Sequence, residues 1–424
     1  MENSVKNIKI TKGVNLNIFK SESFKTAQAS ISIAMPLGDG KSAARALLIH
    51  LLARTNRDYP SIKEMETKLS MLYGASIVPG VIKSGETQVI RLSMECIDDK
   101  FALENESIIS DSLTLMLDML FKPKLQGKSF PEEDVKREKH LMKQKVLSIN
   151  SDKISYALNR LIEEMCKDEI FSVKKLGTVE EIEAVTGEEI FSAYLEILLH
   201  APIQINIVGN IDEEKVEKLL KERFSIARRE KITELHTEML SQAYDEKVIR
   251  ETQNVTQCKL VMGFRAGMTY DLDNYAAIKL MTDILGGDTY SKLFVNVREK
   301  MSLCYYCTCS FDRNKGLILI QSGVEKNKID DAIKAIKNEL NQMIMGNFDD
   351  EVINSAKLSL SNSLDSVFDS PYGIDSWYAS QQTSSTVRTP QQVKEEILAV
   401  TKEEIITAAS FVTLDTTFIL ENEE

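Results

Sequence analysis

His50 is the residue whose type and position most readily suggest metal chemistry, because it lies on a predicted helix over residues 42–55. A zinc site built on one helix uses two histidines four residues apart, so that both imidazoles leave the same face. In the inverted zinc motif, His-x-x-Glu-His, position 53 would carry a glutamate and position 54 a histidine. The chain instead has Ala53 and Arg54. With leucines at 47, 48, 51 and 52, the residues alone favour a buried helix that carries a core histidine.

A second group that could do chemistry is the cysteine run Cys304, Cys307 and Cys309. Its spacing resembles part of a zinc site, but no second cysteine pair or histidine cluster completes four ligands. We therefore interpret these residues as part of a strand. The other three cysteines, at 96, 166 and 258, are scattered, which is typical of reduced thiols in a reducing compartment.

Composition limits the classes of function. A chain of 424 residues with 43% hydrophobic residues predicts two to four folding units with substantial cores. The net charge of −12 argues against a partner made of nucleic acid, whose phosphates require basic surfaces. The first residues lack a signal-peptide pattern, and no apolar run approaches the roughly 18 residues of a membrane span, so we expect a cytoplasmic protein with no membrane partner.

The elements that must position these residues occur twice along the chain. The sequence Val185-Thr-x-Glu-Glu-Ile190 returns as Val400-Thr-x-Glu-Glu-Ile405, and each copy precedes a short predicted strand. Thr186 with Glu189 three residues later predicts a capped helix start. A repeat of half the chain length indicates duplication, so we predict an α+β fold of two homologous halves. Each half is expected to be a mainly antiparallel sheet covered by helices, and the two are expected to face each other across a cavity.

The predicted boundaries follow the repeat. Residues 1–224 form the N-terminal half, the charged stretch 225–245 is the linker, and residues 246–424 form the C-terminal half. Trp377 and Tyr378 follow a proline break in the second half. We expect them in the core, on a helix that covers the second sheet.

One stretch of the second half is specific enough to indicate a family. It contains Leu285-Gly286-Gly287, then Ser291-Lys292-Leu293-Phe294, then Arg298-Glu299-Lys300-Met301-Ser302-Leu303-Cys304-Tyr305. This stretch resembles the pitrilysin/insulinase superfamily of zinc peptidases, in particular its short-chain branch, which includes the mitochondrial processing peptidases. The order of predicted elements around His50 is similar to that family as well. The chain departs from the family pattern at Ser302, where the family has glycine.

The resemblance implies a zinc site that has lost its ligands. Besides Ala53 and Arg54, Lys145 falls where the family has its third ligand, a glutamate, and a cation there would repel a metal. Glu138 matches a second family glutamate seven residues earlier, and we expect it on a solvent-exposed helix face. The degenerate positions are thus His50, Ala53, Arg54 and Lys145, and we expect neither a metal nor another cofactor.

The resemblance also implies a substrate-binding pair, because Arg298 and Tyr305 match the family residues that grip the substrate backbone. Guanidinium and phenol groups can donate hydrogen bonds to peptide carbonyls. From the residues alone, Arg298 could instead pair with a neighbouring glutamate, and Tyr305 could pack at a strand start.

These expectations lead to a functional hypothesis with two alternatives. The chain is expected to be the non-catalytic subunit of a heterodimeric zinc peptidase. Its partner would be a homologous subunit with an intact zinc motif, and its substrate a peptide or unfolded polypeptide. The first alternative is a structural or peptide-binding protein with no proteolytic role. The second is an active enzyme with unusual ligands.

Overall fold

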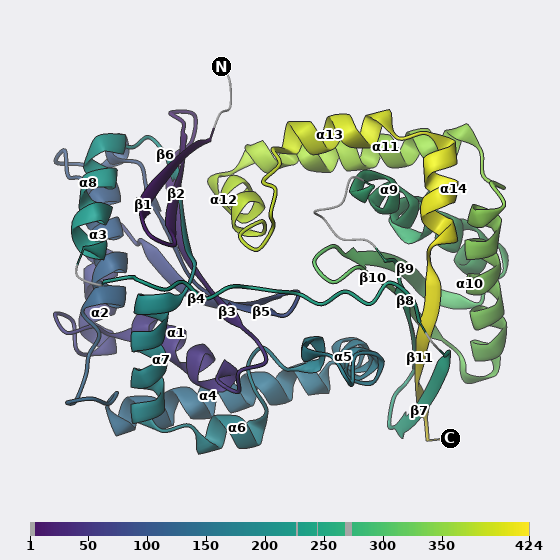
Figure 1. Cartoon of the computed structure of the whole chain (residues 1–424), viewed down its shortest axis with the longest axis horizontal. Helices are drawn as coiled ribbons and strands as arrows, with labels where there is room; N and C mark the ends of the chain where they lie inside the picture. The colour runs from purple at the N-terminus through teal and green to yellow at the C-terminus, as the bar shows by residue number, and fades with distance from the viewer. Residues whose placement is uncertain (1–4, 226–227, 244, 268–273, 424) are drawn as a thin grey trace. The chain divides into compact units, whose positions relative to one another are not determined.

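The computed structural model describes residues 5–225, 228–243, 245–267 and 274–423 (Figure 1). The chain forms two compact units, and neither is a continuous stretch of sequence. Unit 1 consists of residues 1–146, 173–236 and 367–383, and unit 2 of residues 147–172, 237–366 and 384–424. Each unit is built around one sheet.

The sheet of unit 1 has six strands, all antiparallel to their neighbours except for one parallel pair, β2 with β6. Strand β3 is buried on both faces from Ala27 to Met35, which makes it the centre of the core. In spatial order the strands are β1 (Lys6–Thr11), β2 (Val14–Lys20), β6 (Ile203–Gly209), β3 (Thr26–Pro36), β5 (Thr87–Ile97) and β4 (Ser76–Ser84).

The sheet of unit 2 repeats five of these six strands in the same spatial order. One parallel pair, β7 with β11, is again followed by three antiparallel pairings. The strands are β7 (Lys247–Gln253), β11 (Thr413–Asn422), β8 (Cys258–Arg265), β10 (Leu317–Val324) and β9 (Cys304–Asp312). The predicted α+β class, with two mainly antiparallel sheets and covering helices, is therefore confirmed.

The helices of the two halves follow the same repeat. In the first half they are α1 (Ser42–Arg54), α2 (Ile62–Met71), α3 (Ile108–Phe121), α4 (Glu132–Ser151), α6 (Val179–Ala184), α7 (Gly187–His200) and α8 (Glu213–Phe224). In the second half they are α9 (Tyr275–Gly286), a π-helix (Leu293–Lys300), α10 (Ile329–Ile344), α11 (Asp350–Asp365), α13 (Pro390–Ala399) and α14 (Lys402–Ser410). Among the described residues, no helix is long and apolar enough to cross a lipid bilayer.

The recurring Val-Thr-x-Glu-Glu-Ile sequence starts α7 and α14 by the same means. Thr186 accepts a hydrogen bond from the backbone of Glu189, whose side chain accepts one in return from the backbone of Thr186. Thr401 and Glu404 make the same reciprocal pair. The capping box predicted at Thr186 is confirmed, because two otherwise unpaired backbone donors are satisfied locally.

Two helices lie on the sheet of the other half of the sequence. Helix α5 (Lys153–Met165) belongs to unit 2, where its Ala157 and Leu161 pack with Phe418 of β11. Helix α12 (Pro371–Ala379) belongs to unit 1, where Tyr378 packs with Phe19 and Val208. The prediction that Tyr378 is in a core is correct, but the prediction of the second sheet is wrong. The compact units therefore differ from the predicted boundaries by these exchanged segments.

The segment between the halves is bound to unit 1 at Arg229. The guanidinium of this buried residue donates to backbone carbonyls at Lys12, Leu198 and Ala201. Residues 228–241, which lie in the predicted linker 225–245, form neither helix nor strand, and they are divided between unit 1 and unit 2 after His236. Positions 226, 227 and 244 of that prediction lie outside the described residues.

Candidate functional site

The first candidate site is the region around His50 in the last turns of α1. His50 is half-buried, and its Nδ1 lies 2.8 Å from the carbonyl oxygen of Ala46. Because a carbonyl oxygen only accepts hydrogen bonds, Nδ1 carries the proton and donates it. The second nitrogen, Nε2, would be available to a metal, but a single imidazole provides one ligand of the four that a tetrahedral zinc needs.

Helix α1 is held in place by a buried cation earlier in its sequence. The guanidinium of Arg45 donates to Asp39 at 2.6 and 2.8 Å and to Gln88 at 2.7 Å. Arg45 is fully buried, and its bonds to the exposed Asp39 and to the buried Gln88 of β5 fix the start of the helix against that strand. The position of His50 therefore does not depend on a metal.

Arg54 lies one turn after His50 and contacts Glu138 of α4. Its Nε is 3.5 Å from the Glu138 carboxylate, which also lies 3.3 Å from the Nε of Arg137. The Glu138 side chain is 1% exposed, so the prediction of a solvent-exposed helix face is wrong. A buried carboxylate needs compensation by cations, and two guanidinium groups supply it here.

The charges around His50 disfavour a bound cation. Burial lowers the pKa of His50, and the positive charges of Lys145 and Arg54 lower this pKa further, against the opposing effects of the hydrogen bond to Ala46 and of the Glu138 charge. Ala53 offers no ligand atom, and Lys145 is exposed on α4. Within the described part of the chain, no cluster of three or more His, Cys, Asp or Glu residues could hold a metal ion. The residues at this position do not fit zinc.

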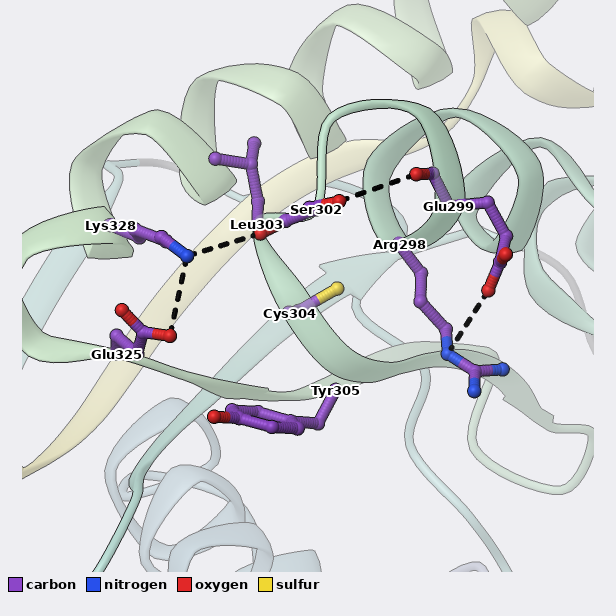
Figure 2. A pocket seen from close by; sticks show the side chains of 8 residues that line it. All are labelled: Arg298, Glu299, Ser302, Leu303, Cys304, Tyr305, Glu325 and Lys328. Atoms are coloured by element: carbon purple, nitrogen blue, oxygen red, sulfur yellow. Dashed lines mark hydrogen bonds and ion pairs between the residues drawn. The ribbon is translucent and has the colours of Figure 1, made fainter.

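The second candidate site is a cavity of about 400 Å³ in unit 2, beside the start of β9 (Figure 2). It lies between the end of the π-helix and the strand that follows. Its lining residues are Arg298, Glu299, Ser302, Leu303, Cys304, Tyr305, Glu325 and Lys328. Both members of the predicted Arg/Tyr pair thus line one cavity.

Arg298 already has partners within its own helix. Its guanidinium carbon lies 4.4 Å from the centre of the Phe294 ring, and its Nε lies 3.6 Å from the carboxylate of Glu299. Its side chain is 38% exposed, so the contact with Glu299 is a weak surface pair that a better acceptor could replace. The ring contact holds the guanidinium over one wall of the cavity by a cation–π interaction.

Tyr305 presents its phenol to solvent. The residue is 63% exposed, and Figure 2 shows its ring pointing away from the Arg298 guanidinium. Tyr305 also lines a neighbouring cavity of about 460 Å³, together with Gln257, Cys258 and Asn422. An exposed tyrosine at the junction of two cavities is not packed into the strand start, and its hydroxyl is available as a donor.

The turn between Arg298 and Tyr305 has a strained backbone at Ser302. The φ angle of Ser302 is 52°, a left-handed conformation that residues other than glycine adopt at a cost. The glycine that the resemblance implies at this position therefore has a conformational reason. The carbonyl of Ser302 accepts from Nζ of Lys328 at 3.3 Å, and Lys328 also lies 3.3 Å from Glu325. Glu325 and Lys328 carry no sequence signal for this site, because they lie outside the stretch that indicates the family.

Comparisons with known proteins identify the family. The chain is 30% identical over 413 residues to the probable inactive metalloprotease YmfF of Bacillus subtilis, an alignment that covers 97% of this chain and 96% of that protein. The chain belongs to the M16, or insulinase, family of peptidases. The M16 chain also matches the family model described as the peptidase M16 inactive domain, over residues 184–360. These similarities confirm the predicted resemblance and show a non-catalytic peptidase homologue.

Solved structures agree with this assignment over the whole M16 chain. A conserved protein from Enterococcus faecalis has a TM-score of 0.89 and 26% identity, with 99% of both chains covered. A peptidase M16 inactive domain from Pseudomonas fluorescens has a TM-score of 0.83 and 15% identity, covering 99% of this chain and 97% of that one. At 15% identity, the similarity to the Pseudomonas fluorescens protein shows a shared fold and nothing more. The unsuitability of the His50 region for zinc agrees with membership of an inactive group.

Proposed function

We propose that this M16 protein is the non-catalytic subunit of a heterodimeric zinc peptidase, and that it contributes Arg298 and Tyr305 to peptide binding at its partner's active site. The observation that carries the proposal is a contrast between two positions. The residues around His50 cannot hold zinc, whereas Arg298 and Tyr305 line a single cavity with exposed donor groups.

The donors suit a polypeptide substrate. A peptide presents carbonyl oxygens that accept hydrogen bonds, and a guanidinium or phenol beside the scissile bond stabilises the carbonyl oxygen as negative charge develops on it. Exchange of the exposed Arg298–Glu299 contact for a peptide carbonyl would cost little, because such surface pairs contribute about 0–1 kcal/mol. A peptide or an unfolded polypeptide is therefore the proposed substrate.

The proposed partner is a homologous chain with an intact His-x-x-Glu-His motif, since this chain has no ligand set of its own among the described residues. Under this proposal the complex works in the cytoplasm. The metal and the general base come from the partner alone, and no cofactor is assigned to this chain.

The test is hydrolysis of a peptide library by the purified partner, reconstituted with variants of this chain. Arg298→Ala and Tyr305→Phe should each leave assembly intact and lower kcat/KM by about a hundredfold, because one donor to a developing oxyanion contributes roughly 3 kcal/mol. Lys300→Ala and Tyr306→Phe are matched controls, since each lies within two positions of a tested residue and lines neither described cavity.

The same experiment separates the proposal from its alternative. Unchanged hydrolysis with Arg298→Ala and Tyr305→Phe, in complexes that assemble normally, would favour a structural or peptide-binding protein with no proteolytic role. Equal losses in the tested and control variants would indicate general misfolding and would also count against the proposed role of the pair. His50→Ala should leave hydrolysis unchanged, because a partner's zinc would not need this imidazole.

A further inference from the structure

The pairing of β9 with β10 contains an irregularity next to the cavity. Cys307 lies opposite Ser322 and Tyr306 opposite Gly323, but the next pair joins Cys304 to Val324. Tyr305 is therefore the extra residue of a β-bulge and has no partner in the ladder. A bulge of this kind shifts the alternation of side chains by one residue, so Cys304, just before the bulge, points to the opposite face from the one it would have in a regular strand.

The bulge places three thiols on one face of β9. In a regular strand, residues 304 and 307 would point to opposite faces, because the side chains alternate. With Tyr305 left out of the alternation, Cys304 shares the face of Cys307 and Cys309. The burial of the side chains agrees with this arrangement. Buried residues are Cys304, Cys307 and Cys309, whereas Tyr305 and Thr308 are exposed.

The bulge also brings Cys304 within range of Cys307. Neighbouring residues on one face of a strand lie about 7 Å apart between Cα atoms, and disulfides usually span roughly 4.4–6.8 Å. A hydrogen bond already joins the side chains of Cys304 and Cys307, and the ladder is interrupted between them, so the backbone can adjust there to form the disulfide. Cys307 and Cys309 have the same face in common but lie in the regular part of the ladder, where β10 fixes their spacing.

Cys304 differs from the other two thiols in its position at a cavity wall, although all three are buried to a similar extent. It lines the 400 Å³ cavity, and Figure 2 shows its sulfur pointing toward the side of the cavity that Arg298 occupies. Cys307 and Cys309 line neither described cavity. A small solute that enters the cavity can thus reach Cys304, whereas Cys307 does not line the cavity.

The surroundings of Cys304 favour its thiolate. A hydrogen bond from Cys307 lowers the pKa of the Cys304 thiol to about 7, with help from Ser322 and from the positive charge of Arg298, while burial opposes the shift. The same contact, together with burial, raises the pKa of Cys307. By contrast, burial raises the pKa of both Cys96 and Cys166 to about 12. A thiolate is the nucleophilic form of cysteine.

We infer that Cys304 is a peroxide-reactive thiol at the cavity wall and that Cys307 resolves its oxidised form as a disulfide. This assignment holds whether or not Arg298 and Tyr305 bind a peptide, although the three residues line the same cavity. Closure of the disulfide would remodel the bulge that presents Tyr305, and oxidation would therefore change the shape of both cavities.

The chemistry needs a hydroperoxide as the oxidant. The Cys304 thiolate attacks one oxygen of hydrogen peroxide, so that an S–O bond forms while the O–O bond breaks and the departing hydroxide takes up a proton to become water. The Cys307 sulfur then attacks the Cys304 sulfenic acid, forming the S–S bond and releasing a second water that carries the Cys307 proton. In sum, two thiols and one hydrogen peroxide give one disulfide and two waters.

The first test treats the full chain with hydrogen peroxide at neutral pH and maps its cysteines by mass spectrometry. The wild type should form the Cys304–Cys307 disulfide. The Cys307→Ser variant should instead retain a sulfenic acid at Cys304, which dimedone captures. Cys309→Ser is the matched control on the same face of the same strand, and it should behave like the wild type. A disulfide that involves Cys309, or dimedone capture spread evenly over the cysteines, would overturn the assignment.

A second measurement does not need the Cys307→Ser variant, so it tests the proposal even if that variant fails to fold. Iodoacetamide should alkylate Cys304 of the folded wild-type chain at least about tenfold faster than Cys96, Cys166 or Cys309, because only Cys304 combines thiolate character with access. Arg298→Ala should slow the alkylation of Cys304, whereas Lys300→Ala should not. Equal alkylation rates at Cys304 and Cys309 would contradict the proposal.

Discussion

Arg54 places a guanidinium one helical turn from His50, where the inverted zinc motif would place its second histidine. The guanidinium does more than remove a ligand, because together with Arg137 it compensates the buried carboxylate of Glu138. A carboxylate that would otherwise attract a cation is thereby engaged in an internal ion pair. The same guanidinium of Arg54 thus both replaces a zinc ligand and compensates the charge of the buried Glu138.

The degenerate zinc site leads to a prediction about zinc binding, which should be absent in the wild-type chain and restored by three substitutions. The wild-type chain should retain no stoichiometric zinc after metal loading and dialysis, because His50 alone is one ligand beside two cations. The triple variant Ala53→Glu, Arg54→His and Lys145→Glu restores the ligand types of the motif and should retain about one zinc per chain. Elemental analysis measures both, and His50→Ala in the triple variant is the control that should abolish binding. Stoichiometric zinc in the wild type, lost on His50→Ala, would contradict the interpretation of a degenerate site.

Ser302 offers a second prediction at the scale of one residue. Its φ angle of 52° is strained for a side chain with a Cβ and free of strain for glycine. Ser302→Gly should therefore raise the free energy of unfolding by about 0.5–1 kcal/mol, and Ser302→Ala, which keeps the Cβ, should not. Urea denaturation of both variants measures the difference. A glycine variant no more stable than the alanine variant would show that the turn is not strained.

At the scale of elements, the two exchanged helices are anchored in similar ways. Helix α12 carries the fully buried Asp375, which accepts hydrogen bonds from Arg91 at 2.5 Å and from Ser30 at 2.6 Å. Helix α5 leads into Glu169, whose carboxylate accepts from Arg265 at 2.6 and 3.1 Å. In each case an acidic residue from one half of the sequence compensates a buried arginine on a strand of the other half.

A glycine on the strand allows α5 to approach its sheet. A Cβ at Gly263 of β8 would lie 2.5 Å from the sulfur of Met165, which is closer than real Cβ contacts come. Gly263 thus has a packing role, because α5 lies directly over this position. The apolar contacts of Ala157 and Leu161 and the ion pairs of Glu169 then act at successive points along one interface.

The ion pairs of Glu169 should make the stability of unit 2 depend on pH. Burial alone would raise the pKa of Glu169, but the hydrogen bonds from Arg265 and Lys315 outweigh it and hold this pKa below its ordinary value of 4.5. The group is more acidic in the folded state than in the unfolded state. Its contribution to stability is therefore present above about pH 4.5 and is lost as the pH falls through the folded-state pKa.

This dependence can be measured with Glu169→Gln. The variant should lose about 3 kcal/mol at pH 7, because the cations of Arg265 and Lys315 stay buried with less compensation. The difference from the wild type should shrink below about pH 4.5. Urea denaturation at several pH values tests both statements, and Glu246→Gln, an exposed partner of Lys337, is the control expected to change stability by less than about 0.5 kcal/mol. A difference that stays constant with pH would exclude this role for the Glu169 charge.

At the scale of the whole molecule, the exchange makes each unit depend on both halves of the sequence. A fragment of residues 237–424 lacks α5 and Glu169, so Arg265 loses a charged partner and an apolar face of the second sheet is uncovered. A fragment of residues 1–236 lacks α12 and Asp375, and Arg91 is uncompensated in the same way. Buried charges without partners are strongly destabilising.

We therefore predict that neither fragment folds alone, and that the two assemble when they are expressed together. Size-exclusion chromatography and circular dichroism of each fragment, separately and after co-expression, provide the measurement. The uncut chain, with a protease site inserted after His236 and cleaved once folded, is the control and should stay associated. A monodisperse, folded fragment 237–424 would show that the exchanged helices are dispensable.

Local sequence was enough for features that depend on neighbouring residues. Thr186 and Glu189 specify a helix start because their bonds are made within one turn, and Cys304 to Cys309 were predicted to form a strand and do so. The exposure of Glu138 was predicted wrongly, since the polar face of α4 is buried at this position by arginines from α4 and from α1, a helix distant in sequence. The bulge at Tyr305 gave no signal in the sequence, because it is a property of the pairing between β9 and β10.

The amino-acid sequence by itself determined the class of fold, the duplication, the family resemblance and the absence of a complete zinc motif, because all of these are patterns of residue type and spacing along the chain. Only the tertiary structure decided which sheet each of α5 and α12 covers, since an apolar helix face specifies burial without specifying its partner. It likewise decided that Glu138 is a buried ion-pair partner and that Cys304 shares a face with Cys307. These properties arise from contacts between segments far apart in sequence, where packing and charge compensation select one arrangement among several that local preferences allow.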